Sequence, residues 1–303
     1  MKKLLLEIKE KCDRCTEKGR VAKYIPELAK ADPSDFGICI YEGGGVYHFV
    51  GDYNKKFTAQ SLIKPIILLA ALIDRGIGQV EHIVGVEPTG KPFDAFNYSD
   101  RALKREHINP MINAGAIVLC SLIEGRDVDG KLERISSLLE TITGNPCREI
   151  DDAVYLSEKK HGNKNRALFY MMKADEMIEG SSDETLDLYF KACALKVSCQ
   201  DLAKIGLLLA NHGLADSGQI FPREYAKYVN ATMAICGLYD GAGEFALRVG
   251  IPAKSGVSGG IMAAVPGRMG IGIYSPPLDK KGNSLLGLKA IEMLSKRLDL
   301  SIY

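Results

Sequence analysis

The sequence predicts an α+β protein whose antiparallel sheet is built from both ends of the chain and flanked by helices. Near the N-terminus, two runs rich in β-branched and aromatic residues flank three consecutive glycines at 43–45, a pattern typical of a hairpin. From about residue 245 to 277 the chain is again glycine-rich and β-like. The region 66–215 between them is mostly helical in pattern, and we expect it to form a second, helical lobe.

The 303 residues are enough for a single large domain with two closely packed lobes. We expect a sheet lobe from about 1–65 and 215–303, and a helical lobe from about 66–214. A cleft between two such lobes is the default place for a binding site. The net charge of +1 gives no electrostatic reason to expect a nucleic acid or a membrane surface as a partner.

The sequence shows no signal for export, for a membrane span or for a metal centre. The apolar run Leu4–Leu6 is too short for a signal peptide, and the longest apolar run, Pro65–Ile73, is far shorter than a bilayer span. We therefore expect a cytoplasmic protein with reduced thiols. Cys12 and Cys15 form a CxxC without a suitably spaced second pair, and the histidines form no HxxxH, so we expect no metal.

Along the chain, the first expected element is helical, over residues 1–31, and it leads into a turn that contains two prolines. The hairpin follows, and then a buried helix that begins near residue 62. Within the helical region, glycine- and proline-containing segments predict loops at 87–96 and 162–166.

Two later helices are also indicated. Ser198 precedes Asp201 in the spacing of a capping box, and Gly213 stands where that helix should end. After the glycine-rich β-like stretch, helical periodicity returns over residues 284–298.

Ser61 and Lys64, in the segment AQSLIKP at 59–65, are the strongest candidates for chemistry. Pro65 lacks an N–H group and clashes with the carbonyl of Ser61, so regular helix should begin at about Leu62. The Ser61 N–H is then available to a ligand oxygen at the positive end of the helix dipole. Lys64 lies one turn later on the same face, and the apolar run behind it should desolvate the lysine and lower its pKa, as a general base requires.

The S-x-x-K pattern is weak by itself, because it recurs at Ser157–Lys160 in a polar segment, where the lysine should be solvated. On the pattern alone, Ser61 can be an ordinary helix-start serine and Lys64 a solvated charge. A Lys-Ser-Gly at 254–256 strengthens the catalytic interpretation, because a backbone N–H near Val257 can act as a second oxyanion donor. The two elements echo the S-x-x-K and K-T-G of penicillin-binding proteins and class A β-lactamases.

Ordered blocks along the chain resemble the serine-dependent glutaminases, a domain shared by bacterial and animal mitochondrial enzymes. The similarity runs from about Tyr24 to Pro277 and includes YIPELAK, AQSLIKP, VGVEPTGKPF, NPMINAGAIV, SEKKHGNKNRA, LDLYFKACALKVSC and CGLYDGAGEFALRVGIPAKSGVSGGI. It implies a β-lactamase/penicillin-binding-protein-like fold and hydrolysis of L-glutamine to L-glutamate and ammonia through a γ-glutamyl-serine acyl-enzyme. It also implies no metal or organic cofactor and a homo-oligomer, either a dimer or a tetramer.

Carried over residue by residue, the resemblance makes Ser61 the nucleophile and Lys64 its base, with Tyr239 and Tyr24 as candidate proton relays. The substrate contacts that it implies are Gln60, Ser61, Asn113, Glu158, Asn165, Tyr189, Tyr239 and Val257.

These residue types suit a free amino acid, but each has a structural alternative. Glu158 can neutralise an α-ammonium group, or it can be a surface helix charge. Asn113, Asn165 and Tyr189 can donate to an α-carboxylate. Asn165 can instead cap a restarting helix and Tyr189 can be a core residue, whereas Asn113 lies in an apolar run and must find a partner if it is buried.

Two other functions stay open at this point. A cytosolic β-lactam or ester hydrolase has the same expected fold, and a non-catalytic amino-acid-binding protein needs the same substrate contacts. The amino-acid contacts at Glu158, Asn165 and Tyr189 favour glutamine over an acylated peptide, and the intact Ser61, Lys64 and Tyr239 set favours an enzyme.

Overall fold

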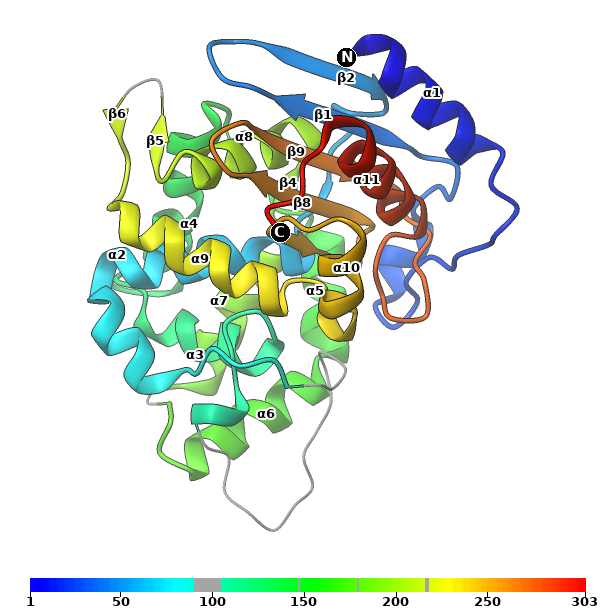
Figure 1. Cartoon of the computed structure of the whole chain (residues 1–303). Helices are drawn as coiled ribbons and strands as arrows, with labels where there is room; N and C mark the ends of the chain where they lie inside the picture. Colours follow the sequence, from blue (N-terminus) through cyan, green and yellow to red (C-terminus); the bar gives the residue numbers. More distant parts are fainter. Residues whose placement is uncertain (90–104, 147, 179, 216–217) are drawn as a thin grey trace.

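The central sheet has five antiparallel strands in the order β2-β1-β9-β8-β7 (Figure 1). The computed structural model describes residues 1–89, 105–146, 148–178, 180–215 and 218–303, so most of the loop predicted at 87–96 lies outside the described residues. The strands are β1 (Gly37–Tyr41), β2 (Tyr47–Gly51), β7 (Ala253–Ser255), β8 (Gly260–Val265) and β9 (Met269–Tyr274).

Both ends of the chain contribute to this sheet, as predicted. β1 pairs with β9, with Ile38 opposite Ile273. The pairing of β1 with β2 confirms the predicted hairpin, in which Gly43, Gly44 and Gly45 all have positive φ. Such backbone angles are strained for any other residue, which explains the run of glycines. The α+β class is confirmed.

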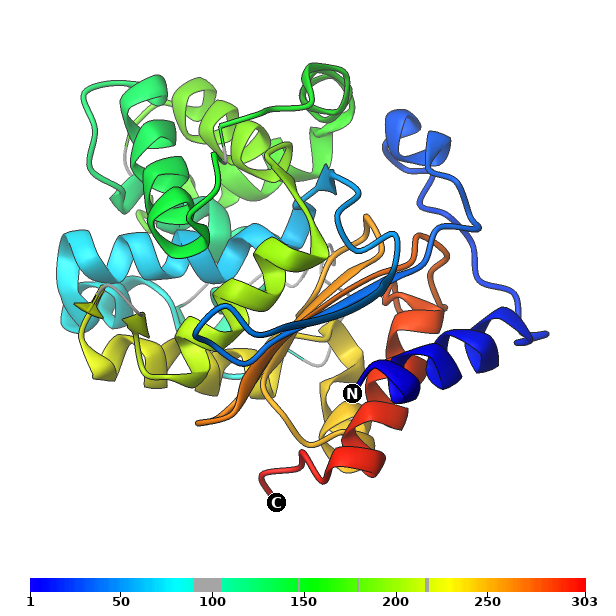
Figure 2. The ribbon, with the colours of Figure 1, turned by 90° about the horizontal axis from the view of Figure 1, so that it is seen from above.

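Helices cover both faces of the sheet (Figure 2). On one face lie α1 (Lys2–Asp13), α10 (Ala242–Arg248) and α11 (Leu285–Leu298), which bury one apolar core with Ile38, Ile271 and Ile273. On the other face lies α8 (Cys199–Ala210). Because side chains alternate along a strand, β9 turns its isoleucines toward the first core and Gly270 and Gly272 toward α8.

The ends of α8 agree with the prediction from sequence. The Ser198 hydroxyl accepts from the N–H of Asp201, and the Asp201 carboxylate accepts from the N–H of Ser198, which completes the capping box. Beyond the last helical residue, Gly213 has a φ of 83° and donates its N–H to the carbonyl of Leu208. The structure therefore confirms the predicted capping box, while the C-cap position falls on Asn211 and Gly213 closes the end of α8 two residues later.

The remaining α-helices pack together beyond α8. They are α2 (Lys64–Ile83), α3 (Asn113–Leu122), α4 (Val128–Thr143), α5 (Asp152–His161), α6 (Asn163–Ala174), α7 (Ser182–Cys193) and α9 (Arg223–Cys236). Four short strands form two small pairs, β3 (Phe57–Thr58) with β4 (Lys196–Val197) and β5 (Leu214–Ala215) with β6 (Gly218–Gln219). Short 3-10 helices are η1 (Pro26–Lys30), η2 (Gln60–Ile63), η3 (Arg105–His107) and η4 (Tyr239–Gly241).

Two expectations about helical segments were wrong. Residues 1–31 are not continuously helical, because the segment 14–25 leaves α1 and pairs with the C-terminal part through a bridge between Arg20 and Leu278. A Cβ at Gly19 would lie 2.8 Å from the carbonyl oxygen of Leu278, so this close approach requires glycine. The loop predicted at 162–166 is also mostly helix, since α6 begins at Asn163.

The division into a sheet lobe and a helical lobe stays a prediction. α8 comes from the region assigned to the helical lobe, yet it lies on the sheet. The larger apolar core is continuous from sheet residues such as Cys39 and Met262 to helical residues such as Leu139.

Among the described residues, no helix combines the length and the apolar character that a membrane crossing requires.

Candidate active site

Ser61 lies in a tight 3-10 turn that leads into α2. The turn spans Gln60–Ile63, and the N–H of Lys64 donates to the carbonyl of Ser61. Regular α-helix begins at Lys64, two residues later than predicted, because this bond closes a 3-10 turn in place of the first α-turn. Gln60 has a φ of 49°, a strained conformation for a residue with a side chain.

Lys64 is completely buried, as the apolar sequence after it predicts. Its Nζ donates to Oδ1 of Asn113 at 2.7 Å and to the carbonyl of Met111 at 3.4 Å. Burial lowers the pKa of Lys64 to about 8, against smaller opposing effects of Cys193 and Glu158. The interpretation of Lys64 as a solvated surface charge is therefore wrong, whereas Lys160 of the second S-x-x-K is exposed, as predicted.

Tyr239 lies far from Ser61 in the sequence but next to it in space. It follows α9 in the short turn η4 and has a φ of 57°. Its phenol shares a hydrogen bond with the Ser61 hydroxyl and donates to the carbonyl of Ser255 at 3.2 Å. Burial raises the pKa of Tyr239 well above the usual range of a phenol, so this hydroxyl keeps its proton at neutral pH.

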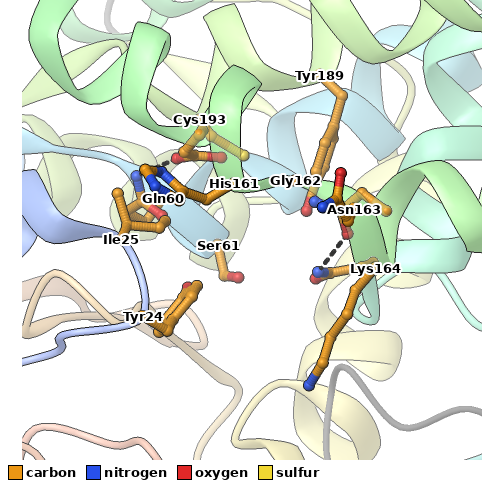
Figure 3. Close-up of a pocket in the computed structure, with 13 residues that line it drawn as sticks. Tyr24, Ile25, Gln60, Ser61, His161, Gly162, Asn163, Lys164, Tyr189 and Cys193 are labelled. Atoms are coloured by element: carbon orange, nitrogen blue, oxygen red, sulfur yellow. Dashed lines mark hydrogen bonds between the residues drawn. The ribbon is translucent and has the colours of Figure 1, made fainter.

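A cavity of about 260 Å³ opens beside Ser61. Figure 3 shows the Ser61 side chain between Tyr24 on one side and Lys164 on the other. The volume lies just below the roughly 300–1,000 Å³ typical of ligand pockets, which suits a small metabolite. The lining residues are Tyr24, Ile25, Gln60, Ser61, Asn113, Glu158, His161, Gly162, Asn163, Lys164, Asn165, Tyr189 and Cys193.

Glu158 supplies a buried carboxylate to one wall of this cavity. It lies on α5 with only 6% of its surface exposed, and Nε2 of Gln60 donates to its Oε1 at 2.6 Å. Burial raises the pKa of Glu158 to about 7, and the Gln60 hydrogen bond and Lys64 act in the opposite direction. The alternative interpretation of Glu158 as a surface helix charge is wrong.

Asn113 and Asn165 form a pair on another wall. Asn113 starts α3, and while its Oδ1 accepts from Lys64, its Nδ2 donates to Oδ1 of Asn165 at 3.0 Å. The polar residue in the apolar run has thus found its partners, as expected. Asn165 is the third residue of α6 and the preceding Gly162 takes the capping position, so the N-cap interpretation is wrong.

The other predicted residues lie around the same space. Tyr189 on α7 is buried and lines the cavity, whereas Tyr24 lines it with 56% of its surface exposed. Val257 is buried just after β7 and packs in one apolar cluster with Tyr239 and Ile25, but it lies outside the cavity wall. Residues from the N-terminal segment, the helical region and the C-terminal strands therefore meet at Ser61.

Several cavity residues were missed from the sequence. His161, Gly162, Asn163 and Lys164 line the cavity between Glu158 and Asn165, and the short spacing of those two predicted residues is the signal that could have found them. Cys193, one turn after Tyr189 on α7, gave no such signal. Within the part of the chain that the structure describes, no three His, Cys, Asp or Glu side chains gather as a metal site would require.

The glutaminase family model matches residues 19–303. The chain belongs to the glutaminase family. A curated relative, Glutaminase 2 of Clostridium perfringens, is 47% identical over 305 aligned residues that span 100% of both chains. A glutaminase of Clostridium tetani is also 47% identical with the same coverage.

A solved glutaminase structure has the same architecture. A probable glutaminase from Bacillus subtilis, complexed with 6-diazo-5-oxo-L-norleucine, gives a TM-score of 0.88 at 39% identity, covering 99% of this chain and 94% of that one. The fold is the β-lactamase-like fold of glutaminases, with an antiparallel sheet and a helical region.

Proposed function

We propose that this glutaminase hydrolyses L-glutamine to L-glutamate and ammonia through a γ-glutamyl ester on Ser61. Family membership and full-length relatives named glutaminase support the reaction. The observation that carries the mechanism is the placement of Ser61 in the wall of a small cavity, with the completely buried Lys64 at the start of the helix that follows it. Each role given below to a residue is part of this proposal.

The cavity offers a carboxylate for the α-ammonium group of a free amino acid and hydrogen-bond donors for its α-carboxylate. Glu158 can accept from the α-ammonium group, because its buried carboxylate lines the cavity and can accept bonds in addition to the one from the Gln60 amide. The amide groups of Asn113 and Asn165 and the hydroxyl of Tyr189 can donate to the α-carboxylate. This arrangement orients the side-chain amide of glutamine toward Ser61.

Acylation begins when neutral Lys64 takes the Ser61 proton and Oγ attacks the amide carbon. The carbonyl oxygen becomes negative, and we assign its stabilisation to the backbone N–H groups of Ser61 and Val257. The C–N bond then breaks, and ammonia leaves with a proton that Lys64 delivers directly or through the Tyr239 phenol, which donates its own proton and regains one from Lys64. Water hydrolyses the ester by the reverse proton path and releases glutamate.

A related protein supports a covalent step. A Bacillus subtilis glutaminase that is 38% identical to this chain forms a covalent complex with 5-oxo-L-norleucine after reaction with 6-diazo-5-oxo-L-norleucine. That reagent is an α-amino acid with a diazoketone at the place of the glutamine amide, so that family member can bond covalently to a glutamine-like amino acid.

The first experiment measures ammonia release from L-glutamine by Ser61→Ala and Lys64→Ala. We expect each variant to lose at least about 10³-fold in kcat, because nucleophile and base act as one unit. Lys160→Ala is the matched control, since the lysine of the second S-x-x-K is exposed and its loss should leave kcat unchanged. A folded Ser61→Ala or Lys64→Ala with near-wild-type turnover contradicts the assignment.

The same assay with L-asparagine, D-glutamine and a chromogenic lactam separates the other functions. Turnover of the lactam without turnover of glutamine would indicate a β-lactam hydrolase. Binding of glutamine without turnover of any substrate would indicate a binding protein. We expect turnover of L-glutamine.

Two properties of the whole protein complete the proposal. We propose a homo-oligomer, a dimer or a tetramer, which sedimentation velocity can test. We also propose a cytoplasmic location, supported by the cysteines of the described residues, which are all unpaired and mostly buried. Cell fractionation tests the location.

A further inference from the structure

Lys254 is a second completely buried lysine, and the proposed mechanism gives it no part. It lies in β7, and its Nζ donates to the carbonyl of Gly237 at 3.0 Å and to the carbonyl of Ser255 at 2.5 Å. The same nitrogen lies 4.5 Å from the centre of the Tyr239 ring. Three neighbours therefore surround the amine: two carbonyl oxygens and one aromatic face.

A buried lysine is a costly choice for a purely structural position. Burial lowers the pKa of Lys254 well below its usual range, and the nearby Lys64 lowers it further. An apolar side chain of similar length would fill this space without the cost of desolvating an amine. The contacts of Lys254 therefore call for another explanation. Its amine bonds the carbonyl of Gly237 just before Tyr239 and the carbonyl of Ser255 that accepts the Tyr239 hydroxyl, and it faces the Tyr239 ring.

The two carbonyls that bind Lys254 belong to Gly237, just before Tyr239 in the chain, and to Ser255, which also accepts from the Tyr239 hydroxyl. Gly237 ends α9 two residues before Tyr239, and its carbonyl also accepts the N–H of Ser255. Lys254 thus links the turn that carries Tyr239 to the strand that leads to Val257. The positive φ of Tyr239 is an unfavourable conformation that such a link can hold in place.

The carbonyl oxygen of Ser255 is shared between the two side chains. It accepts from Lys254 at 2.5 Å and from the Tyr239 hydroxyl at only 3.2 Å. The carbonyl oxygen can accept both bonds, but the bond from the phenol is longer than is usual for O–H···O, so the phenol proton is held weakly there. The phenol oxygen also shares a hydrogen bond with Ser61, so its proton can turn toward a group that leaves from the serine.

We propose that Lys254 is a positioning residue that holds the Tyr239 phenol against Ser61, so that the phenol can pass its proton to the departing ammonia and regain one from Lys64. The proposal rests on the proposed function. In this proposal Lys254 acts through Tyr239 and the backbone beside it, and it does not line the cavity. Its effect should therefore appear in kcat and depend on the hydroxyl of Tyr239.

A double-mutant cycle of Lys254→Met and Tyr239→Phe on glutamine hydrolysis tests this dependence. Lys254→Met should lower kcat about 10- to 100-fold, which is part of the roughly 10²- to 10⁴-fold that general acid–base catalysis contributes, and change KM less than about threefold. In the Tyr239→Phe background, which keeps the ring but lacks the hydroxyl, the same change should lower kcat less than about threefold.

Lys204→Met is the matched control, because Lys204 also donates to a backbone carbonyl, that of Thr143, but lies on α8 away from Ser61. It should leave kcat unchanged. If Lys254→Met does not fold, Lys254→Gln takes its place in the cycle, since its amide can still donate to a carbonyl. Thermal unfolding identifies folded variants.

Equal losses of kcat from Lys254→Met in both backgrounds would overturn the proposal, and so would wild-type kcat. If neither variant of Lys254 folds, the lysine is structural and the proposal is wrong. If Tyr239→Phe alone has wild-type kcat, Tyr239 is not the relay and the inference fails with it. Loss of turnover in Ser61→Ala would still support the proposed reaction in that case, so the two failures are distinguishable.

Discussion

At the scale of single residues, the proposed mechanism makes the activation of Ser61 depend on the proton carried by Lys64. Burial lowers the pKa of Lys64 to about 8, and only the neutral amine can accept the serine proton. We therefore expect kcat/KM for glutamine to rise with pH through about 8 and to level off above it. Below about 7, Glu158 also gains a proton and loses its attraction for the substrate ammonium, so the fall toward acid should become steeper.

The variant Asn113→Asp tests whether Lys64 is the group whose titration shapes this pH profile. The new carboxylate would lie where Oδ1 now accepts from the lysine at 2.7 Å, and it would favour the charged amine. We expect the alkaline midpoint of kcat/KM to move upward by about 1–3 pH units. Lys160→Ala should leave the profile in place. An unchanged midpoint in Asn113→Asp would show that another group titrates there.

Features of the site could be predicted from sequence where the interacting residues lie within one helical turn of each other. The spacing of Ser61, Lys64 and Pro65 and the apolar run after them were sufficient to predict the buried lysine. The same reasoning left the burial of Glu158 open and did not predict the amine of Lys254 against the Tyr239 ring. Those features depend on contacts between distant segments, which no local spacing encodes.

At the scale of elements, α8 is held against the sheet by direct backbone contact. A Cβ at Gly270 of β9 would lie 1.9 Å from the carbonyl oxygen of Ala203 in α8. We expect Gly270→Ala to destabilise the protein by about 3 kcal/mol, at the upper end for overpacked positions, because backbone cannot move aside like a flexible side chain. Urea unfolding at equilibrium measures the change.

Gly78→Ala is the matched control for this prediction. Gly78 lies in α2, and a Cβ there has open space around it. Alanine is the better helix former, so we expect a stabilisation of about 0.5–1 kcal/mol. Equal effects of the two substitutions would mean that close packing of α8 on β9 does not limit stability.

Element boundaries show where sequence patterns reach their limit. The capping box of α8 and the glycine hairpin follow from local chemistry, and both were predicted. The non-helical course of the segment 14–25 follows from its pairing with Leu278, far away in the chain, and was not predicted. A local sequence pattern predicts a helix or a hairpin well when the hydrogen bonds that stabilise that element join residues of the same segment.

At the scale of the whole molecule, the sheet and the helical region share one core. The larger apolar core joins Cys39 and Met262 of the sheet to Leu139 of α4, and strands from both chain ends pair in the sheet. Ser61 and the residues around it also come from all of these parts. Because the parts share buried surface, we expect them to unfold together, although a chain of 303 residues is larger than most two-state proteins.

A pair of Leu→Ala variants tests whether the lobes are independent. Leu139 on α4 and Leu294 on α11 are both fully buried, one in each apolar core. Each truncation should lower the stability of the entire protein by about 2–5 kcal/mol. In urea, far-UV circular dichroism and glutaminase activity should then show one coincident transition that shifts in both variants. If Leu294→Ala instead shifted only one of two separate transitions, the sheet and helical regions would be independent domains, and the active site between them would depend on their docking.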